Sequence, residues 1–169
     1  LLFLLLTSVF MASAATPGLV TEQSPHYDLE LLYHERGYEK GREITKRRLK
    51  ETPDDKDLYW HYVRFGYELG ATVSRTDPTM DKVAFYQDLV DHADKGLELA
   101  PTDPHLSFAH GVALGRLGTT RGVLSSLFTA KTIEQDWLKA VQSDIRYSSL
   151  GREEVLPCDL HQALGQFYR

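Results

Sequence analysis

The chain has 169 residues, of which 25% are charged, and a formal net charge of −5 at pH 7. Nothing in this balance favours nucleic-acid binding, which usually requires a basic surface. A single cysteine, Cys158, excludes an internal disulfide, and we expect it to be a small buried apolar residue. The length predicts one folded domain of ordinary size.

The first residues have the pattern of an export signal. Residues 1–10 are mostly apolar and are followed by Ala12 and Ala14, spaced as at a signal-peptide cleavage site. We predict a signal peptide over residues 1–14, a disordered leader over residues 15–25 and a folded domain over residues 26–169. The alternatives are a buried N-terminal helix or an uncleaved anchor. The apolar run is shorter than the ~20 residues that cross a bilayer, so we expect no transmembrane span in the mature chain.

Apolar residues at helical spacing recur along the rest of the chain. They predict an all-α protein with helices over residues 26–37, 38–50, 57–69, 81–99, 105–117, 134–145 and 157–169. Residues 71–79, 119–122 and 146–154 are expected to be connections. Residues 123–133 form an apolar segment that we interpret as an additional helix packing across the others.

An internal repeat organises these helices. An offset of 48 residues joins three pairs: Leu49 and Leu97, Pro53 and Pro101, and Gly70 and Gly118. Each proline would stop a helix, because it lacks an amide hydrogen and clashes with the preceding turn. Each glycine of the third pair would end the next helix in a left-handed conformation. The order helix, turn, helix, proline predicts stacked helical hairpins.

Small residues mark places where two helices could approach closely. They are Gly96, Gly111 and Ala140, and Ala140 follows Gly96 by 44 residues, which extends the repeat weakly. The distances from Gly70 to Gly96 (26 residues) and from Gly118 to Ala140 (22 residues) are long for such a repeat. Each second helix or the loop before it would therefore carry roughly ten to fourteen extra residues.

At these positions the chain resembles the tetratricopeptide repeat (TPR) motif, since Gly96, Pro101, Gly111 and Gly118 fall at its spacing. The resemblance implies an α–α superhelix, a TPR-like solenoid of about three helical hairpins with lengthened second helices. In such arrays the first helix of each hairpin lines a concave binding surface. His110 departs from the motif, which prefers leucine there.

Residues 114–141 and 160–169 carry a second resemblance. They resemble the exported T-component family of TRAP-type transporters, and they are similar to the TPR-like domain of regulator-of-microtubule-dynamics proteins. The first of these implies a bacterial periplasmic or cell-envelope protein. It would be an accessory of solute uptake with a periplasmic solute-binding protein as partner. The second implies another compartment, which a cleaved signal peptide disfavours.

The predicted third helix is rich in aromatic residues, which lie on two of its faces. Tyr59 and Tyr62 lie on one face, and Trp60 and Tyr67 lie on the other. We expect this helix to line a groove and to supply contact area through Tyr59, Tyr62 and Tyr67, because large amphipathic rings are common at interfaces. Ser107 and His110, on the helix that would face the same groove, would orient the partner. The alternative is that all the aromatic residues of this helix belong to the core.

No catalytic motif is present, so we expect a binding protein that is not an enzyme and has no cofactor. Asp88 and His92 are four residues apart and could reach one metal ion, but a metal site needs three or four ligands, so we expect none. The basic residues at positions 46–50 are explained by the end of a helix, with anion binding as the alternative. An alternative function is the binding of a small apolar ligand between the hairpins.

Overall fold

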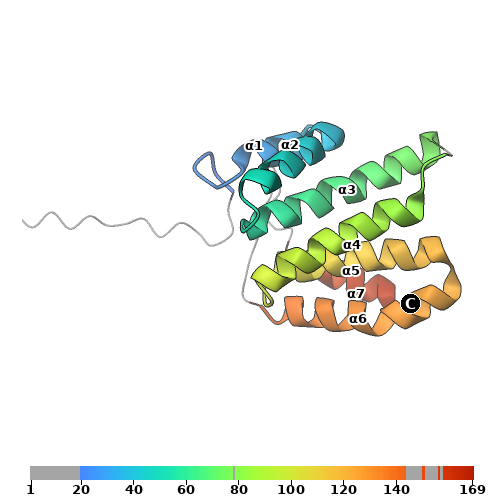
Figure 1. Ribbon diagram of the computed structural model, residues 1–169. Helices are drawn as coiled ribbons and strands as arrows, with labels where there is room; N and C mark the ends of the chain where they lie inside the picture. The colour runs from blue at the N-terminus through green and yellow to red at the C-terminus, as the bar shows by residue number, and fades with distance from the viewer. Residues whose placement is uncertain (1–19, 78, 144–149, 151–155, 157) are drawn as a thin grey trace, which may run out of the picture.

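A computed structural model describes residues 20–77, 79–143, 150, 156 and 158–169. This part of the chain contains seven α-helices and no strand, so the predicted all-α class is confirmed (Figure 1). The predicted signal peptide and most of the predicted loop at residues 146–154 lie outside the described residues. The helices are α1 (Tyr27–His34), α2 (Tyr38–Glu51), α3 (Lys56–Thr76), α4 (Lys82–Leu99), α5 (Pro104–Arg121), α6 (Val123–Val141) and α7 (Cys158–Phe167).

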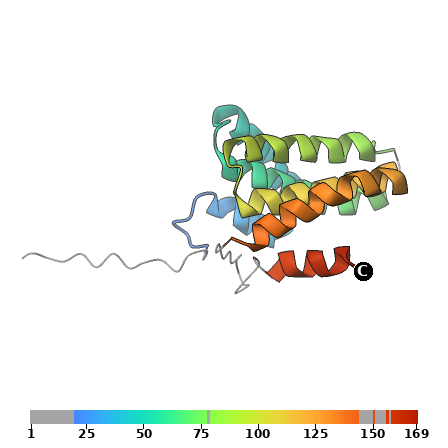
Figure 2. The same ribbon diagram turned by 90° about the horizontal axis from the view of Figure 1, so that it is seen from below.

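The helices form a stack of antiparallel hairpins. Each helix from α2 to α6 packs against the helices before and after it, and α3 also packs against α5. The pair α1 and α2 lies at one end of the stack and the pair α5 and α6 at the other, where α7 packs against α6 (Figures 1 and 2). Alternate helices therefore face one side of the stack.

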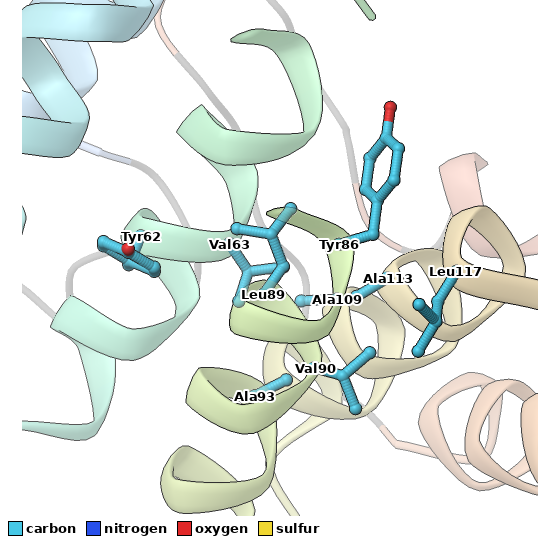
Figure 3. Close-up of a cluster of buried hydrophobic side chains, with 9 residues drawn as sticks. All are labelled: Tyr62, Val63, Tyr86, Leu89, Val90, Ala93, Ala109, Ala113 and Leu117. Carbon is cyan, nitrogen blue, oxygen red and sulfur yellow. The ribbon is translucent and has the colours of Figure 1, made fainter. Parts of the chain in front are cut away.

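Three groups of buried side chains hold the stack together. The group in Figure 3 joins α3, α4 and α5 through Tyr62, Val63, Tyr86, Leu89, Val90, Ala93, Ala109, Ala113 and Leu117. A second group, around Trp137 and Leu160, joins α6 to α7, and a third, around Leu29 and Phe65, joins α1 to α3. Burial of apolar surface at about 25 cal/mol per Å² makes these groups the main source of stability.

Aspartates begin three consecutive helices, α3 to α5. The carboxylate of Asp55 accepts a hydrogen bond from the amide of Asp57, and Asp81 accepts one from Ala84. Asp103 accepts from the amides of His105 and Leu106. Such N-caps satisfy amides that have no partner within the helix. Local chemistry therefore sets where these helices start.

The helix ends differ from the prediction at both glycines of the repeat. α3 continues beyond Gly70 to Thr76, and α5 continues beyond Gly118 to Arg121. A Cβ at Gly70 would lie 2.8 Å from the Phe85 ring and 2.9 Å from the Tyr86 hydroxyl. Gly70 thus permits close packing of α4 and does not end a helix. α3 and α5, the first helices of two hairpins, are therefore longer than the sequence predicts.

The predicted segment at residues 123–133 is also different in the structure. It is the first part of α6, which runs unbroken from Val123 to Val141 and pairs with α5. Gly122, with φ of 109°, makes the turn between the two helices in a conformation that favours glycine. The additional residues therefore lengthen a hairpin helix and do not add a crossing one.

Within the predicted leader, residues 20–25 include a turn in which the Thr21 amide donates to the Ser24 hydroxyl, and Val20 packs against the group around Trp137. Cys158, expected to be buried, is exposed at the start of α7. Among the described helices, none has the length and apolar character needed to cross a membrane.

Candidate functional site: an aromatic groove along alternate helices

A groove of about 850 Å³ runs along α1, α3, α5 and α7. These are the first helices of the three hairpins, followed by the terminal helix. Six of the rings that line it are Tyr33, Trp60, Tyr67, Phe108, Trp137 and Phe167. Charged side chains lie among these rings, including Arg64, Glu68, Arg116 and Asp159. The groove therefore offers apolar area together with separate donors and acceptors.

One face of α3 supplies the middle of the groove. Trp60, Arg64 and Tyr67 line it and are spaced i, i+4 and i+7, which places them above one another on a helix. Glu68 lies beside them, four residues after Arg64. Tyr67 is one of the residues predicted to contact a partner. Trp60 is not, although its spacing to Arg64 and Tyr67 is visible in the sequence.

Arg64 lies at the centre of this face. Its guanidinium is 3.5 Å from the centre of the Tyr33 ring and 4.6 Å from that of the Trp60 ring. One guanidinium nitrogen, Nη1, donates to both carboxylate oxygens of the buried Glu30, at 2.7 and 2.9 Å. Cation–π contacts and a charge-assisted hydrogen bond hold the side chain in place. Arg64 therefore fixes the orientation of two rings that line the groove.

Two further polar contacts cross the groove. The Tyr33 hydroxyl donates to Glu68 at 3.0 Å, and Arg116 donates to the Tyr67 hydroxyl at 3.0 Å while its guanidinium lies 4.9 Å from that ring. Burial raises the pKa of Tyr33 to about 12, so its hydroxyl remains a neutral donor at physiological pH. Arg116 is exposed, and its partner here is a neutral hydroxyl, so its positive charge is available to a bound molecule.

The structure places Tyr59 and Tyr62 away from the groove, which corrects the assignment of both as contact residues. Tyr59 is 7% exposed and Tyr62 is fully buried. The Tyr62 ring stacks on His92 of α4 with ring centres 4.0 Å apart, and its hydroxyl donates to Asp88 at 2.6 Å. The hairpin partner α4 covers this face of α3, so the two tyrosines serve the interior.

Ser107 and His110 also lie away from the groove, contrary to their predicted role. Ser107 is buried, with 1% of its surface exposed. His110 lies between carboxylates of two other helices: its Nε2 is 3.1 Å from Asp94 of α4, and its Nδ1 is 2.6 Å from Asp136 of α6. The groove face of α5 is instead formed by residues such as Phe108, Val112 and Arg116.

The pair Asp88 and His92, weighed above as metal ligands, belongs to a hydrogen-bonded network. Arg42 donates to Asp88 at 2.7 Å, and His92 Nδ1 lies 2.7 Å from the Asp88 backbone carbonyl. No group of three or more potential metal ligands occurs in the part of the chain that the structure describes.

In the basic segment at positions 46–50, Arg48 pairs with Asp28 through two hydrogen bonds of 3.0 and 2.6 Å.

The remaining residues of the predicted repeat lie in the core, in turns or at close helix contacts. Leu49 packs against two of the buried groups, and Ala140 belongs to the group around Trp137. Pro53 and Pro101 lie in the turns after α2 and α4, and Leu97 is half-buried near the end of α4. A Cβ at Gly96 would lie 2.5 Å from Leu106 and 2.9 Å from the Tyr59 Cβ, so a larger residue has little room there.

Comparison of the chain with protein-family models, with curated proteins and with solved structures finds no match. The function of the groove is therefore inferred from its own geometry.

A buried histidine, His61, makes the stability of the protein depend on pH. His61 is buried beside Trp60, and burial, followed by the charge of Arg64, lowers its pKa well below the usual 6.5. The other charged or titratable groups that face it are Glu30, His26, His105 and Arg48. The folded state therefore binds fewer protons here than the unfolded chain. The stability contributed by neutral His61 is complete above about pH 6.5 and is lost progressively as the pH falls below that value.

We expect the free energy of unfolding, measured by urea titration, to decline between about pH 7 and pH 5 in the wild type, and less steeply in His61→Phe. Burial also lowers the pKa of His92, so part of the decline is expected to remain in the variant. If the free energy of unfolding declined equally steeply in the wild type and in His61→Phe, the pH dependence could not be assigned to His61.

Proposed function

We propose that this protein is a TPR-like helical repeat scaffold, an α–α superhelix that binds a segment of a partner protein in the aromatic groove. The observation that carries the proposal is that α1, α3 and α5 line one groove with tyrosine, tryptophan and arginine side chains, to which α7 adds Phe167. Helical repeat proteins use extended concave surfaces of this kind for binding. Tyrosine, tryptophan and arginine are also the residues that contribute most to protein interfaces.

The chemistry of the groove indicates what the bound segment carries. The ring surfaces of Trp60 and Phe108 suit apolar side chains, while the exposed guanidinium of Arg116 suits a carboxylate or a backbone carbonyl. Glu68 and Asp159 are acceptors for amides or ammonium groups. We therefore propose a segment that alternates apolar and polar side chains.

The proposed setting is the bacterial periplasm or cell envelope, on the pattern of residues 1–14. The resemblance to the T-component family supports an accessory role in solute uptake, with a periplasmic solute-binding protein as the partner. The proposal is for a binding protein and not for an enzyme.

The double variant Tyr67→Ala/Arg116→Ala is expected to bind the partner at least about tenfold more weakly than the wild type, because interface tyrosine and arginine side chains commonly contribute more than 1 kcal/mol each. The mature chain, immobilised, would capture the partner from a periplasmic extract. The purified partner would then be titrated against each variant by calorimetry.

The matched control is Phe128→Ala. Phe128 lies on α6, is 85% exposed and does not line the groove. Its removal is expected to leave affinity unchanged. Loss of binding in the Phe128 variant, with retention in the double variant, would place the binding surface on α6 and refute the groove proposal.

A second candidate function is the binding of a small apolar ligand in the same groove. The volume of about 850 Å³ and the aromatic lining favour it, because sites for small molecules usually measure about 300–1,000 Å³ and are mainly apolar. Mass spectrometry of the purified protein under native and denaturing conditions distinguishes the two functions. A stoichiometric lipid or metabolite released on denaturation would favour the small ligand.

A further inference from the structure

The first half of α6 carries large apolar side chains on its outer side. Leu124, Leu127 and Phe128 are 73%, 66% and 85% exposed. Their spacing of i, i+3 and i+4 places them beside one another on one face of the helix. At 3.6 residues per turn, this face lies opposite the side that contacts α5, on which Ser126 and Thr129 lie. We call these three side chains the apolar face of α6.

The inner side of the same segment is small and polar. A Cβ at Gly118 of α5 would lie 3.0 Å from Thr129 Oγ1 and 3.1 Å from Ser126 Cα, so the two helices are closely packed there. The hydroxyls of Ser126 and Thr129 donate to backbone carbonyls within one turn, at 3.3 and 3.1 Å. A helix that only covers a core has the reverse pattern, with its apolar side chains inside. The packing of α5 against α6 therefore does not account for the apolar face.

The segment that carries the apolar face is positively charged. Residues 104–133 contain no aspartate or glutamate, although the chain has 24 acidic residues. Lys131 is exposed one turn beyond the apolar face, on the same side of α6. Arg121, exposed at the end of α5, donates at 2.9 Å to the neutral amide of Gln87, which in turn donates to Asp91 of α4. Cations beside exposed apolar side chains are complementary to an anionic lipid surface.

We propose that the apolar face of α6, together with Lys131 and Arg121, docks the protein onto an anionic lipid bilayer. The three apolar side chains enter the boundary between headgroups and acyl chains, and the two cations bind phosphate groups. A second copy of the chain is a poorer occupant. A two-fold contact would bring the same cations together, and this segment has no carboxylate to pair with them.

This docking is independent of the proposed function of the groove. Phe128 does not line the groove, and a calorimetric titration of the partner contains no lipid. Phe128→Ala therefore remains a valid control for the groove.

The first test is flotation of the purified protein with lipid vesicles. We expect the protein to bind vesicles of phosphatidylglycerol and phosphatidylcholine, and to bind vesicles of phosphatidylcholine alone much more weakly. Added sodium chloride is expected to weaken binding, because salt screens the charges. Absence of binding to the anionic vesicles overturns the proposal. A dimer detected by light scattering and separated by Leu127→Ala/Phe128→Ala would place a second copy on the face and also overturn it.

The variant Phe128→Trp tests whether the face enters the bilayer. Lipids with brominated acyl chains quench tryptophans that they contact. We expect stronger quenching in the variant than in the wild type, whose Trp60 and Trp137 line the groove. Equal quenching in the two proteins would mean that another surface meets the vesicle, and would refute the docking site.

The double variant Leu127→Ala/Phe128→Ala is expected to bind anionic vesicles at least about tenfold more weakly, because the burial of two large apolar side chains is lost. Lys131→Glu is expected to weaken binding at least about fivefold, the contribution of one basic residue near such a surface. The matched controls are Leu31→Ala and Lys40→Glu, exposed positions on α1 and α2 at the opposite end of the stack (Figure 1), which are expected to bind as the wild type does. Equal losses in Lys131→Glu and Lys40→Glu would show that only net charge matters and would contradict the site.

Discussion

Replacing Glu30 with alanine is expected to lower the free energy of unfolding by about 3–5 kcal/mol, because it removes the buried carboxylate that pairs with the largely buried guanidinium of Arg64. The Glu30 side chain is 3% exposed, and that of Arg64 is 12% exposed. Without the carboxylate, the guanidinium of Arg64 remains beside the buried ring of His61 and between two aromatic rings. Too little water reaches it to replace the lost interaction. Urea unfolding followed by circular dichroism measures the loss.

The control is an exposed ion pair in the same region. Asp28, whose side chain is 52% exposed, pairs with Arg48, and Asp28→Ala is expected to lower the free energy of unfolding by less than about 1 kcal/mol. The double variant Glu30→Leu/Arg64→Met is expected to be more stable than Glu30→Ala, since it removes both charges and retains apolar volume. Equal losses in Glu30→Ala and Asp28→Ala would contradict the claim that burial makes the Glu30 pair important.

Gly111→Ala is the second substitution with a large expected effect. A Cβ at this position would lie 2.2 Å from Trp137 Nε1 and 2.8 Å from Trp137 Cδ1, so the indole has to move. The indole nitrogen donates to the Phe108 carbonyl at 3.2 Å, and the ring packs against Phe167 of α7. We expect the free energy of unfolding to fall by about 1–3 kcal/mol, as in other overpacked cores. A change in tryptophan near-ultraviolet circular dichroism is expected to accompany the loss.

Gly115 is the matched control, four residues along the same helix. A Cβ there would lie 3.9 Å from Ile133, which is an ordinary contact. Gly115→Ala is therefore expected to stabilise the protein by about 0.5–1 kcal/mol, because alanine is the better helix former. If Gly111→Ala proved equally stabilising, the close approach of α5 and α6 at Trp137 would be refuted.

The helices of this protein could be predicted from the sequence because their signals are local. The starts of α3, α4 and α5 depend on Asp55, Asp81 and Asp103, whose side chains cap the amides of neighbouring residues. The turns after α2 and α4 contain prolines at positions 53 and 101, which cannot continue a helix. Such signals act within a few residues and do not require knowledge of the fold.

Glycine has two structural uses in this chain, one at helix ends and one where helices approach closely. Gly70 and Gly118 were assigned to helix ends, where a left-handed conformation favours glycine. The structure places both inside helices, at points where another helix approaches. Gly122, which does have a positive φ, follows the last residue of α5, four residues after Gly118. The local sequence does not distinguish a glycine required by backbone conformation from one required by a neighbouring helix.

The sequence also does not show which face of α3 lines the groove. α3 carries aromatic side chains on two faces, so its helical period alone does not show which face is covered. Arg64 and Glu68, which lie on the face of Trp60, were the available signal, since the face of Tyr59 and Tyr62 has no charged residue at the equivalent spacing. The sequence by itself determined an all-α chain and the starts of α3, α4 and α5, because these depend on neighbouring residues. Only the tertiary structure decided that α4 covers Tyr62 while Trp60 and Tyr67 line a groove, because that choice depends on which helices pack together.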